Sequence, residues 1–418
     1  MNQAFYTGLT GMQSYQFGLD VISNNISNIN TTGFRSSNAE FASFYDNALG
    51  AALNGGPTND GIGTGVRVQT TTMDESYGSF LSTDSATDLS IGGDGWFGVT
   101  SNFGDMFTRA GAFTFDSDRN LVSYDGMYLL GTMGNNLSGD TMTDIVSTTP
   151  LAAASAQDKI TLPVNLTIDA EPTTTANFWG NLRSDEALIR QNSTVIAPDG
   201  DDSFLTLDYT KSAIQPEVGS SWDILATLSS KVDNTVFDTQ EGVAVFNSNG
   251  ALESYTIAPL DNEGVSLTVD LGEDFAGVTA IDNLEVSYGS SHDGRTAGEL
   301  IGYDVNIHGE VIASFDNGVS SSVARVAIFH FQNDQGLERI SGTHFKESSN
   351  SGEPIFYTNE NGESILGADL KSFSLENSNM QFEQGLTELI IMQRSLDANS
   401  KSITTGDELI KKALEMDA

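Results

Sequence analysis

Residues 380–418 read MQFEQGLTELIIMQRSLDANSKSITTGDELIKKALEMDA, and this stretch decides the fold. Its apolar side chains recur at every seventh position: Phe382, Leu389, Leu396, Ile403 and Ile410. No proline follows Pro354, so the segment can continue as one helix. The pattern predicts a long amphipathic helix with a coiled-coil seam. Such a seam requires a partner helix.

The opposite end of the chain carries a matching pattern. Apolar side chains fill both seam positions of a seven-residue repeat there: Phe5, Met12, Leu19 and Ile26 in one, and Tyr15, Ile22 and Ile29 in the other. We predict a second helix that pairs with the C-terminal one as a coiled coil. The alternative reading is that each stripe packs on an ordinary globular core.

Charge and glycine content distinguish these two readings. The first 34 residues contain one charged side chain, Asp20, although the chain has 57 acidic residues. A helix on an ordinary core would show a charged outer face, so an uncharged polar face indicates a helix enclosed by neighbours. Gly11 and Gly18 predict close approach of another backbone, and each glycine costs about 1 kcal/mol relative to alanine. We therefore expect these helices to be weakly ordered in the free subunit and to become ordered when copies pack together.

The composition excludes several functional classes. A net charge of −39 argues against binding to nucleic-acid phosphates and to anionic membrane surfaces. The chain has no cysteine, so it has no disulfide, thiolate nucleophile or cysteine metal site. Neither a cleavable secretory signal nor a bilayer-spanning apolar run is recognisable. We expect no membrane insertion, and export would need another route.

Between the helices the signals are mainly those of short β-strands. Since the terminal helices must meet, the economical arrangement is nested, and we expect an α+β fold, mainly β, in which β-rich domains are inserted between the helices. The predicted parts are a terminal helical domain (1–34 and 378–418), a connector (35–65 and 366–377), an inner β domain (66–150 and 298–365) and an inserted outer β domain (151–297). The outer block holds 23 acidic and 6 basic residues, which indicates a solvent-facing domain.

No motif indicates catalysis. The four histidines lack metal-ligand spacing, and His330, between two phenylalanines, is predicted to be an exposed strand residue. Residues 116–120 (DSDRN) match the start of a calcium loop, but Leu121 replaces the required glycine and Met127 the closing glutamate, which favours a β-turn. We expect no catalytic, cofactor-binding or metal site, and no enzyme.

Four segments resemble one known family. Residues 20–35 (DVISNNISNINTTGFR) and 392–405 (MQRSLDANSKSITT) resemble the N- and C-terminal signatures of the bacterial flagellar rod and hook proteins. Residues 88–97 (DLSIGGDGWF) and 107–113 (FTRAGAF) are similar to the β-domain motifs of that family. The match departs from the family pattern at Met392 and Leu396.

The resemblance, together with the large inserted block, favours the hook members over the shorter rod proteins. It implies a homopolymer that forms a flexible curved tube, transmits torque from rod to filament and encloses the export channel. It also implies an extracellular location, export by the flagellar type III apparatus, and contacts with the distal rod, the hook cap and the hook–filament junction proteins. The alternatives are a distal rod-type subunit and a secreted β-rich adhesin or hydrolase.

Overall fold

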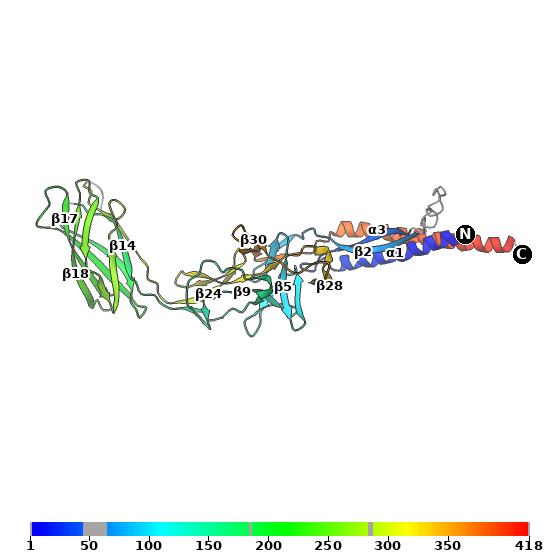
Figure 1. The fold of residues 1–418 in the computed structure, drawn as a ribbon, viewed down its shortest axis with the longest axis horizontal. Coiled ribbons are helices and arrows are strands. Elements are labelled where there is room, and N and C mark those ends of the chain that lie inside the picture. Colours follow the sequence, from blue (N-terminus) through cyan, green and yellow to red (C-terminus); the bar gives the residue numbers. More distant parts are fainter. Residues whose placement is uncertain (1, 45–64, 184–185, 283–286, 417–418) are drawn as a thin grey trace.

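A computed structural model describes residues 2–44, 65–183, 186–282 and 287–416. Figure 1 shows an elongated molecule, with both termini at one end and a separate β domain at the other. The prediction of a mainly β chain with a helix at each end is confirmed. Among the described residues, neither helix has the length and apolar character needed to cross a membrane.

The terminal part combines two helices with a β-ribbon. Helices α1 (Asn2–Ser27) and α3 (Phe382–Met416) lie side by side, and β1 (Ser37–Phe44) pairs antiparallel with β2 (Gly65–Met73) next to α1 (Figure 1). The chain turns after α1 at Gly33, whose φ of +67° is a left-handed conformation that favours glycine. An added Cβ at Gly33 would overlap the backbone of Arg109 and Ala110, so glycine also permits this close approach.

The inner domain is built by both halves of the chain. Its large sheet joins β9 (Tyr128–Met133) to β26 (Ser320–Val326), which are antiparallel neighbours. The other strands of this sheet within the described residues are β5 (Trp96–Ser101), β6 (Gly104–Thr108), β7 (Phe113–Phe115), β8 (Leu121–Ser123), β10 (Leu137–Ser138), β11 (Thr141–Met142), β12 (Asp158–Lys159), β13 (Thr167–Ile168), β24 (Gly298–Val305), β25 (Glu310–Phe315), β27 (Ile328–Phe329), β28 (Glu338–Ser341) and β29 (His344–Lys346).

Short strand pairs and two 3₁₀ turns complete the inner domain. They are β3 (Phe80–Ser82) with β33 (Ser374–Glu376), β4 (Leu89–Gly92) with β32 (Asp369–Ser372), β30 (Tyr357–Thr358) with β31 (Ser364–Ile365), η1 (Ala154–Ala156) and η2 (Asp334–Gly336). The first two pairs matter most here, because they attach the segment that leads into α3 to the N-terminal half of the domain.

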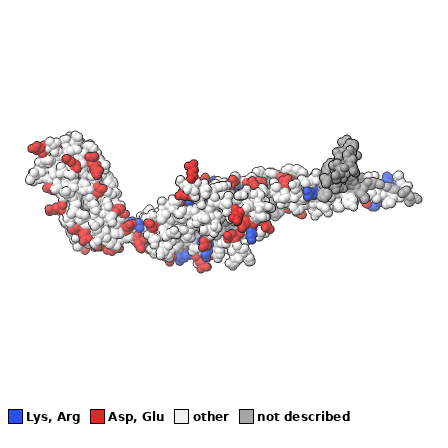
Figure 2. Space-filling model, in the orientation of Figure 1, with Lys and Arg blue, Asp and Glu red and all other residues white. Residues whose placement is uncertain are grey.

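The outer domain has its own core between two sheets. One sheet contains β15 (Leu188–Ile196), β16 (Asp202–Lys211), β17 (Ser220–Ser230), β18 (Val236–Phe246) and β19 (Leu252–Ile257); the other contains β14 (Thr175–Asn181), β20 (Leu260–Asn262), β21 (Val265–Asp270), β22 (Val278–Thr279) and β23 (Ser287–His292). Along β16 buried and partly exposed residues alternate, as expected when one face of a sheet is covered. Acidic side chains are spread over the visible face of this domain (Figure 2).

The boundary between the two domains differs from the predicted one. Side chains from Leu151 to Ile168 are buried in the inner core, and the chain crosses to the outer domain at Glu171 and returns at Arg295. These two residues form a β-bridge and an ion pair of 2.6 Å. The outer domain therefore begins near 171, not at 151. Threonine and alanine near 150 indicated a linker, but their small side chains let this segment pack closely over the sheet.

The predicted connectors also differ from the structure. Leu366 and Leu370 are buried in the inner core, so the segment 366–377 belongs to the inner domain. Residues 66–73 form β2 beside α1, outside the large sheet in which they were placed. Within the first connector, residues 37–44 form β1, and residues 45–64 lie outside the described residues.

Separate cores predict separate unfolding transitions. Trp222 is fully buried in the outer core, so Trp222→Ala should lower the stability of the outer domain by about 3–5 kcal/mol and leave the inner transition unchanged. Scanning calorimetry measures both transitions. Trp179→Ala is the matched control, because Trp179 lies in the same domain but is 45% exposed. A shift of the inner transition in the Trp222 variant would show that the two cores unfold together.

Candidate assembly interface

Helices α1 and α3 approach each other most closely at glycines. A Cβ added to Gly8 would lie 2.8 Å from Cγ1 of Ile403, and one added to Gly11 would lie 2.6 Å from Oδ1 of Asn399. Gly18 faces Met392 in the same way. The order of these contacts along the two helices shows that the helices run antiparallel. The absence of a side chain at Gly8, Gly11 and Gly18 is what allows α3 to come this close.

The residues predicted for the seam occupy different environments. Buried positions on α1 include Gly11, Gly18 and Ile22, whereas Phe5, Met12, Leu19, Ile26 and Ile29 are half-buried. On α3, half-buried positions are Leu389, Leu396, Ile403 and Ile410, and Phe382 is 53% exposed. Gly8, Gly11 and Gly18, the glycine strip of α1, thus face α3 directly.

Helix α3 also carries large apolar side chains that are exposed within the described residues. Its exposed side chains are Phe382, Leu386, Ile390, Ile391, Leu409 and Leu414. Phe382, Leu386 and Ile390 recur at every fourth position and form an exposed apolar stripe at the start of the helix, and exposed apolar patches mark interaction surfaces. The start of α3 therefore presents exposed apolar side chains in addition to the residues that face α1.

Part of the polar side of α1 lies against the β1–β2 ribbon. Ser14 donates a hydrogen bond to the carbonyl oxygen of Val66 (3.2 Å), and the amide of Asn25 donates to the carbonyl of Ser37 (2.8 Å). The ring of Tyr15 lies against Phe41, with 5.7 Å between the ring centroids. The uncharged polar side chains of this helix thus bind a neighbouring backbone, which charged side chains could not do without losing hydration.

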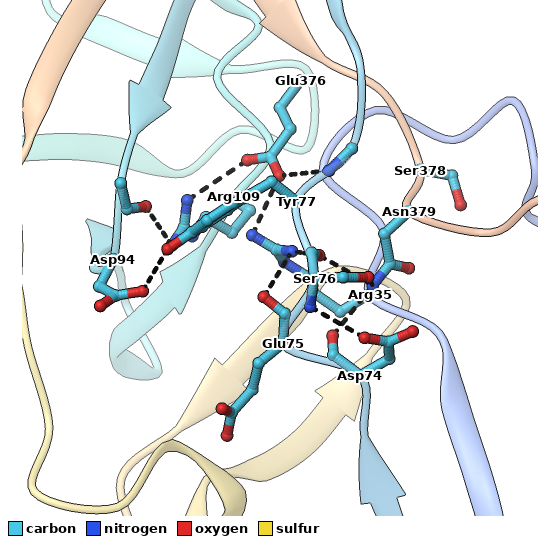
Figure 3. Close-up of polar contacts among 12 residues, drawn as sticks. Arg35, Asp74, Glu75, Ser76, Tyr77, Asp94, Arg109, Glu376, Ser378 and Asn379 are labelled. Atoms are coloured by element: carbon cyan, nitrogen blue, oxygen red, sulfur yellow. Dashed lines mark hydrogen bonds and ion pairs between the residues drawn. The ribbon is translucent and has the colours of Figure 1, made fainter.

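A buried cluster of charges lies where the terminal helices join the inner domain (Figure 3). The carboxylate of Glu376 contacts Arg35 on one side (3.0 Å) and Arg109 on the other (3.4 Å). All three side chains are at most 4% exposed. Arg35 follows α1, Arg109 follows β6 and Glu376 ends the last strand before α3. The cluster therefore ties together three segments that are far apart in the sequence.

Backbone groups and aromatic rings complete the cluster. Arg109 donates to the carbonyl of Gly93 (2.8 Å), and Glu376 accepts a hydrogen bond from the amide of Gly78 (3.0 Å). Burial and the nearby Arg35 lower the pKa of Arg109 to about 10, and Glu376 opposes this shift. The Tyr77 ring lies within 6 Å of both guanidinium groups, and its hydroxyl donates to Asp94 (2.5 Å). The hydrogen bond to Asp94 raises the pKa of Tyr77.

Asn379 provides a second link between the chain ends. Its side-chain oxygen accepts a hydrogen bond from the amide of Ser36 (2.8 Å), and its side-chain nitrogen donates to the carbonyl of Asp74 (2.9 Å) (Figure 3). The amide of Gly33 also donates to the carbonyl of Glu376 (2.7 Å). These contacts fix where α1 ends relative to where α3 begins.

Sequence reasoning did not predict this cluster. One usable signal was present: Arg35 is the first cationic side chain of the chain, and both Arg35 and Arg109 stand within the quoted family motifs. Nothing in the sequence pairs them with Glu376 among 57 acidic residues.

Asp116 and His330, which the sequence analysis considered as possible sites, make hydrogen bonds to neighbouring parts of the fold. Both oxygens of Asp116 accept hydrogen bonds from the turn it begins, including the amides of Asp118 (2.9 Å) and Asn120 (2.8 Å). His330 is buried, contrary to prediction, and its Nε2 lies 2.6 Å from the carbonyl oxygen of Leu366. The described residues include no cluster of His, Asp and Glu arranged to hold a metal ion.

Removing the central carboxylate charge should destabilise the inner domain. Glu376→Gln keeps the shape but leaves two buried guanidinium groups without a counter-charge, so we expect a loss of about 3–5 kcal/mol in the inner calorimetric transition. Asp202→Asn removes the partner of Lys231 in an exposed pair and is the control, with an expected loss below about 1 kcal/mol. An inner transition equal to that of the wild type would contradict a stabilising role for the cluster.

Family models match three parts of the chain. "Flagella basal body rod protein" covers residues 5–35, "Flagellar hook protein FlgE/F/G D1 domain" covers 90–175, and "Flagellar basal body rod FlgEFG protein C-terminal" covers 371–416. Arg35, Arg109 and Glu376 each fall in a different one of these regions. The buried cluster thus joins the three matched regions.

Curated relatives match along almost the whole chain. The chain is 27% identical to the flagellar hook protein FlgE of Borreliella burgdorferi, with 100% of both chains covered, and 24% identical to that of Escherichia coli K12, with 99% of this chain and 100% of the relative covered. The solved structure of Helicobacter pylori flagellar hook protein FlgE2 has the same fold over 71% of this chain and 100% of that one (TM-score 0.56, 16% identity). The matched domains and the full-length relatives support a bacterial flagellar hook protein.

Proposed function

We propose that this chain is the structural subunit of a flagellar hook, which polymerises into a flexible curved tube, transmits torque from rod to filament and encloses the export channel. The observation that carries the proposal is the exposed apolar stripe of Phe382, Leu386 and Ile390 on α3, the helix that also packs on α1. In a helical polymer, neighbouring copies cover such a face repeatedly. The matches to hook proteins over their full length favour the hook over the rod.

The assembly element in this proposal is an antiparallel coiled coil of α1 and α3. Its interior combines the glycines of α1 with the seam residues of α3, including Leu396 and Ile403. Glycine lowers the stability of the isolated helix by about 1 kcal/mol per residue, and packing between copies offsets this cost. The subunit would therefore order its ends fully only in the tube.

The exposed face of α3 supplies the free energy for polymerisation. Burying one Leu or Ile side chain stabilises a complex by about 1.5–3 kcal/mol, and Leu386, Ile390 and Ile391 are all available. Contacts that repeat along a tube add up, so individually modest contacts suffice.

The proposed role places the chain outside the cell. Its partners would be further copies of itself, the distal rod, the hook cap, the hook–filament junction proteins and the flagellar type III export apparatus. A cysteine-free chain fits this route, because no thiol needs protection or pairing during export. The proposed role is mechanical and involves no catalysis.

Antibody labelling tests the location directly. Antibody against the outer domain should label a short curved segment between the cell envelope and the filament in electron micrographs of flagella from the source cells. Label that appears only after the envelope is stripped would assign the chain to the rod. Label spread over the cell surface would favour an adhesin or hydrolase.

Substitution at the helix contact should separate folding from assembly. Gly11→Leu favours an isolated helix but places a large side chain against Asn399, so we expect retained helix content by circular dichroism and loss of sedimenting polymer. Gly406→Leu is the matched control, since no atom lies within 4 Å of a Cβ added there. Equal polymerisation of both variants would rule out close packing at Gly11.

A further inference from the structure

Gln335, an exposed residue in the turn η2 of the inner domain, is held by hydrogen bonds at both ends of its side-chain amide. Its Oε1 accepts a hydrogen bond from the backbone amide of Met73 (2.8 Å). Its Nε2 donates to the carbonyl of Met73 (2.8 Å) and to Oε1 of Glu75 (2.8 Å), so both N–H groups of the amide are used. These three bonds fix in one conformation a long side chain that would otherwise sample several rotamers in water.

The contact with Met73 takes the place of a strand partner. Met73 is the last residue of β2, and β2 pairs on one side with β1, where Ser37 lies opposite Met73. Both backbone groups of Met73 are bonded to Gln335, so they lie on the edge of β2 that faces away from β1. The Gln335 amide therefore covers this edge of the ribbon as a neighbouring strand would.

The turn that carries Gln335 is firmly attached to the inner domain. The hydroxyl of Ser348 donates to the carbonyl of Gly336 (2.6 Å). A Cβ added to Gly336 would lie 2.4 Å from the backbone of Asn350, so the turn packs closely on a second loop. Gln335 thus belongs to a fixed part of the inner domain, whereas Met73 belongs to the ribbon beside α1.

The same segment of the inner domain also contacts the end of α1. Arg339 donates to the carbonyl of Arg35 (2.6 Å), and its guanidinium lies over the rings of Phe34 and Phe345, at 5.1 and 4.9 Å from their centroids. Residues 335–339 therefore hold the terminal part at two points, at the end of α1 and at the end of β2. One point of contact fixes a position, and the second fixes a direction.

We propose that Gln335 is a positioning residue, which sets the angle of the β1–β2 ribbon, and of α1 beside it, on the inner domain. The buried charge cluster already joins these two parts, and exposed hydrogen bonds contribute little net stability because water replaces them. Loss of the Gln335 amide should therefore release the angle without unfolding either part. In the proposed hook, on which this consequence rests, the angle is repeated in every copy and so contributes to the shape of the tube.

The absence of cysteine allows two spin labels to report this angle. Gln69→Cys on β2 and Thr114→Cys on β7 place the labels at exposed positions on the two parts. Double electron–electron resonance then measures the distribution of distances between the labels in the monomeric chain. The distribution should be narrow with Gln335 present, and Gln335→Ala should broaden it or shift its maximum. An unchanged distribution in the alanine variant would overturn the proposal.

Gln215→Ala is the matched control, because Gln215 makes the same type of contact within the outer domain. Its Oε1 accepts a hydrogen bond from the amide of Ser221 (3.0 Å), and its Nε2 donates to the carbonyls of Ser221 (2.9 Å) and Ser212 (2.7 Å). The label distances should not respond to this substitution, and an equal response to both substitutions would refute the proposal. An inner calorimetric transition at the wild-type temperature checks that the response to Gln335→Ala does not come from unfolding.

Gln335→Glu separates the hydrogen bonds from the size of the side chain. The carboxylate can still accept from the amide of Met73, but it cannot donate to the carbonyl and it faces the carboxylate of Glu75. This variant should broaden the distance distribution, and the further substitution Glu75→Gln should narrow it again, because the contact between positions 335 and 75 then forms with donor and acceptor exchanged. A narrow distribution in Gln335→Glu alone, or no narrowing in the double variant, would contradict the assigned contact.

The shape of the polymer connects this measurement to the proposed function. Polymers of Gln335→Ala should differ in curvature from wild-type polymers in electron micrographs, whereas those of Gln215→Ala should not. Unchanged curvature would contradict a role for Gln335 in the tube. A wild-type chain that forms no polymer would overturn the hook function alone, since the label distances test the positioning role in the monomer.

Discussion

The burial of Glu376 between Arg35 and Arg109 is the constraint on which the rest of the structure depends. Each ion alone would be strongly destabilised by removal from water, so the three segments that carry them must meet. One segment follows α1, one belongs to the inner sheet and one leads into α3. Closing the cluster therefore sets the positions of both helices on the β domain, and the contacts of Asn379 and Gly33 fix their direction.

The buried cluster of Arg35, Arg109 and Glu376 connects the terminal helices rigidly to the inner domain. In the tube that we propose, the exposed apolar side chains of α3 would contact neighbouring copies, and the inner and outer domains would lie at larger radius. A force applied to the outer part reaches the helices through the buried cluster, whose charges cannot separate without being exposed or left unpaired. The inner and outer domains are joined more narrowly, by the two chain segments that pair at Glu171 and Arg295. The outer domain can therefore adjust its position more easily than the inner domain can.

A large part of the fold was predictable, because periodicity and composition are local properties. The seven-residue repeats predicted both helices, and alternation with turn residues predicted a mainly β interior. The glycines at 11 and 18 indicated a close backbone contact. Domain boundaries were less accurate: the segment from Leu151 to Ile168 has a linker-like start but places apolar side chains in the inner core, and their burial depends on the sheet beneath them.

The sequence by itself determined the elements, since a seven-residue apolar repeat at each end predicts a helix that needs a partner whatever its surroundings. Only the tertiary structure decided which side chains meet. It selected Glu376 from many carboxylates, turned the glycine strip of α1 toward α3, and placed Gln335 at the edge of β2. The physical reason is the separation along the sequence: periodicity depends on residues a few positions apart, whereas the buried ion pairs join residues separated by hundreds of positions.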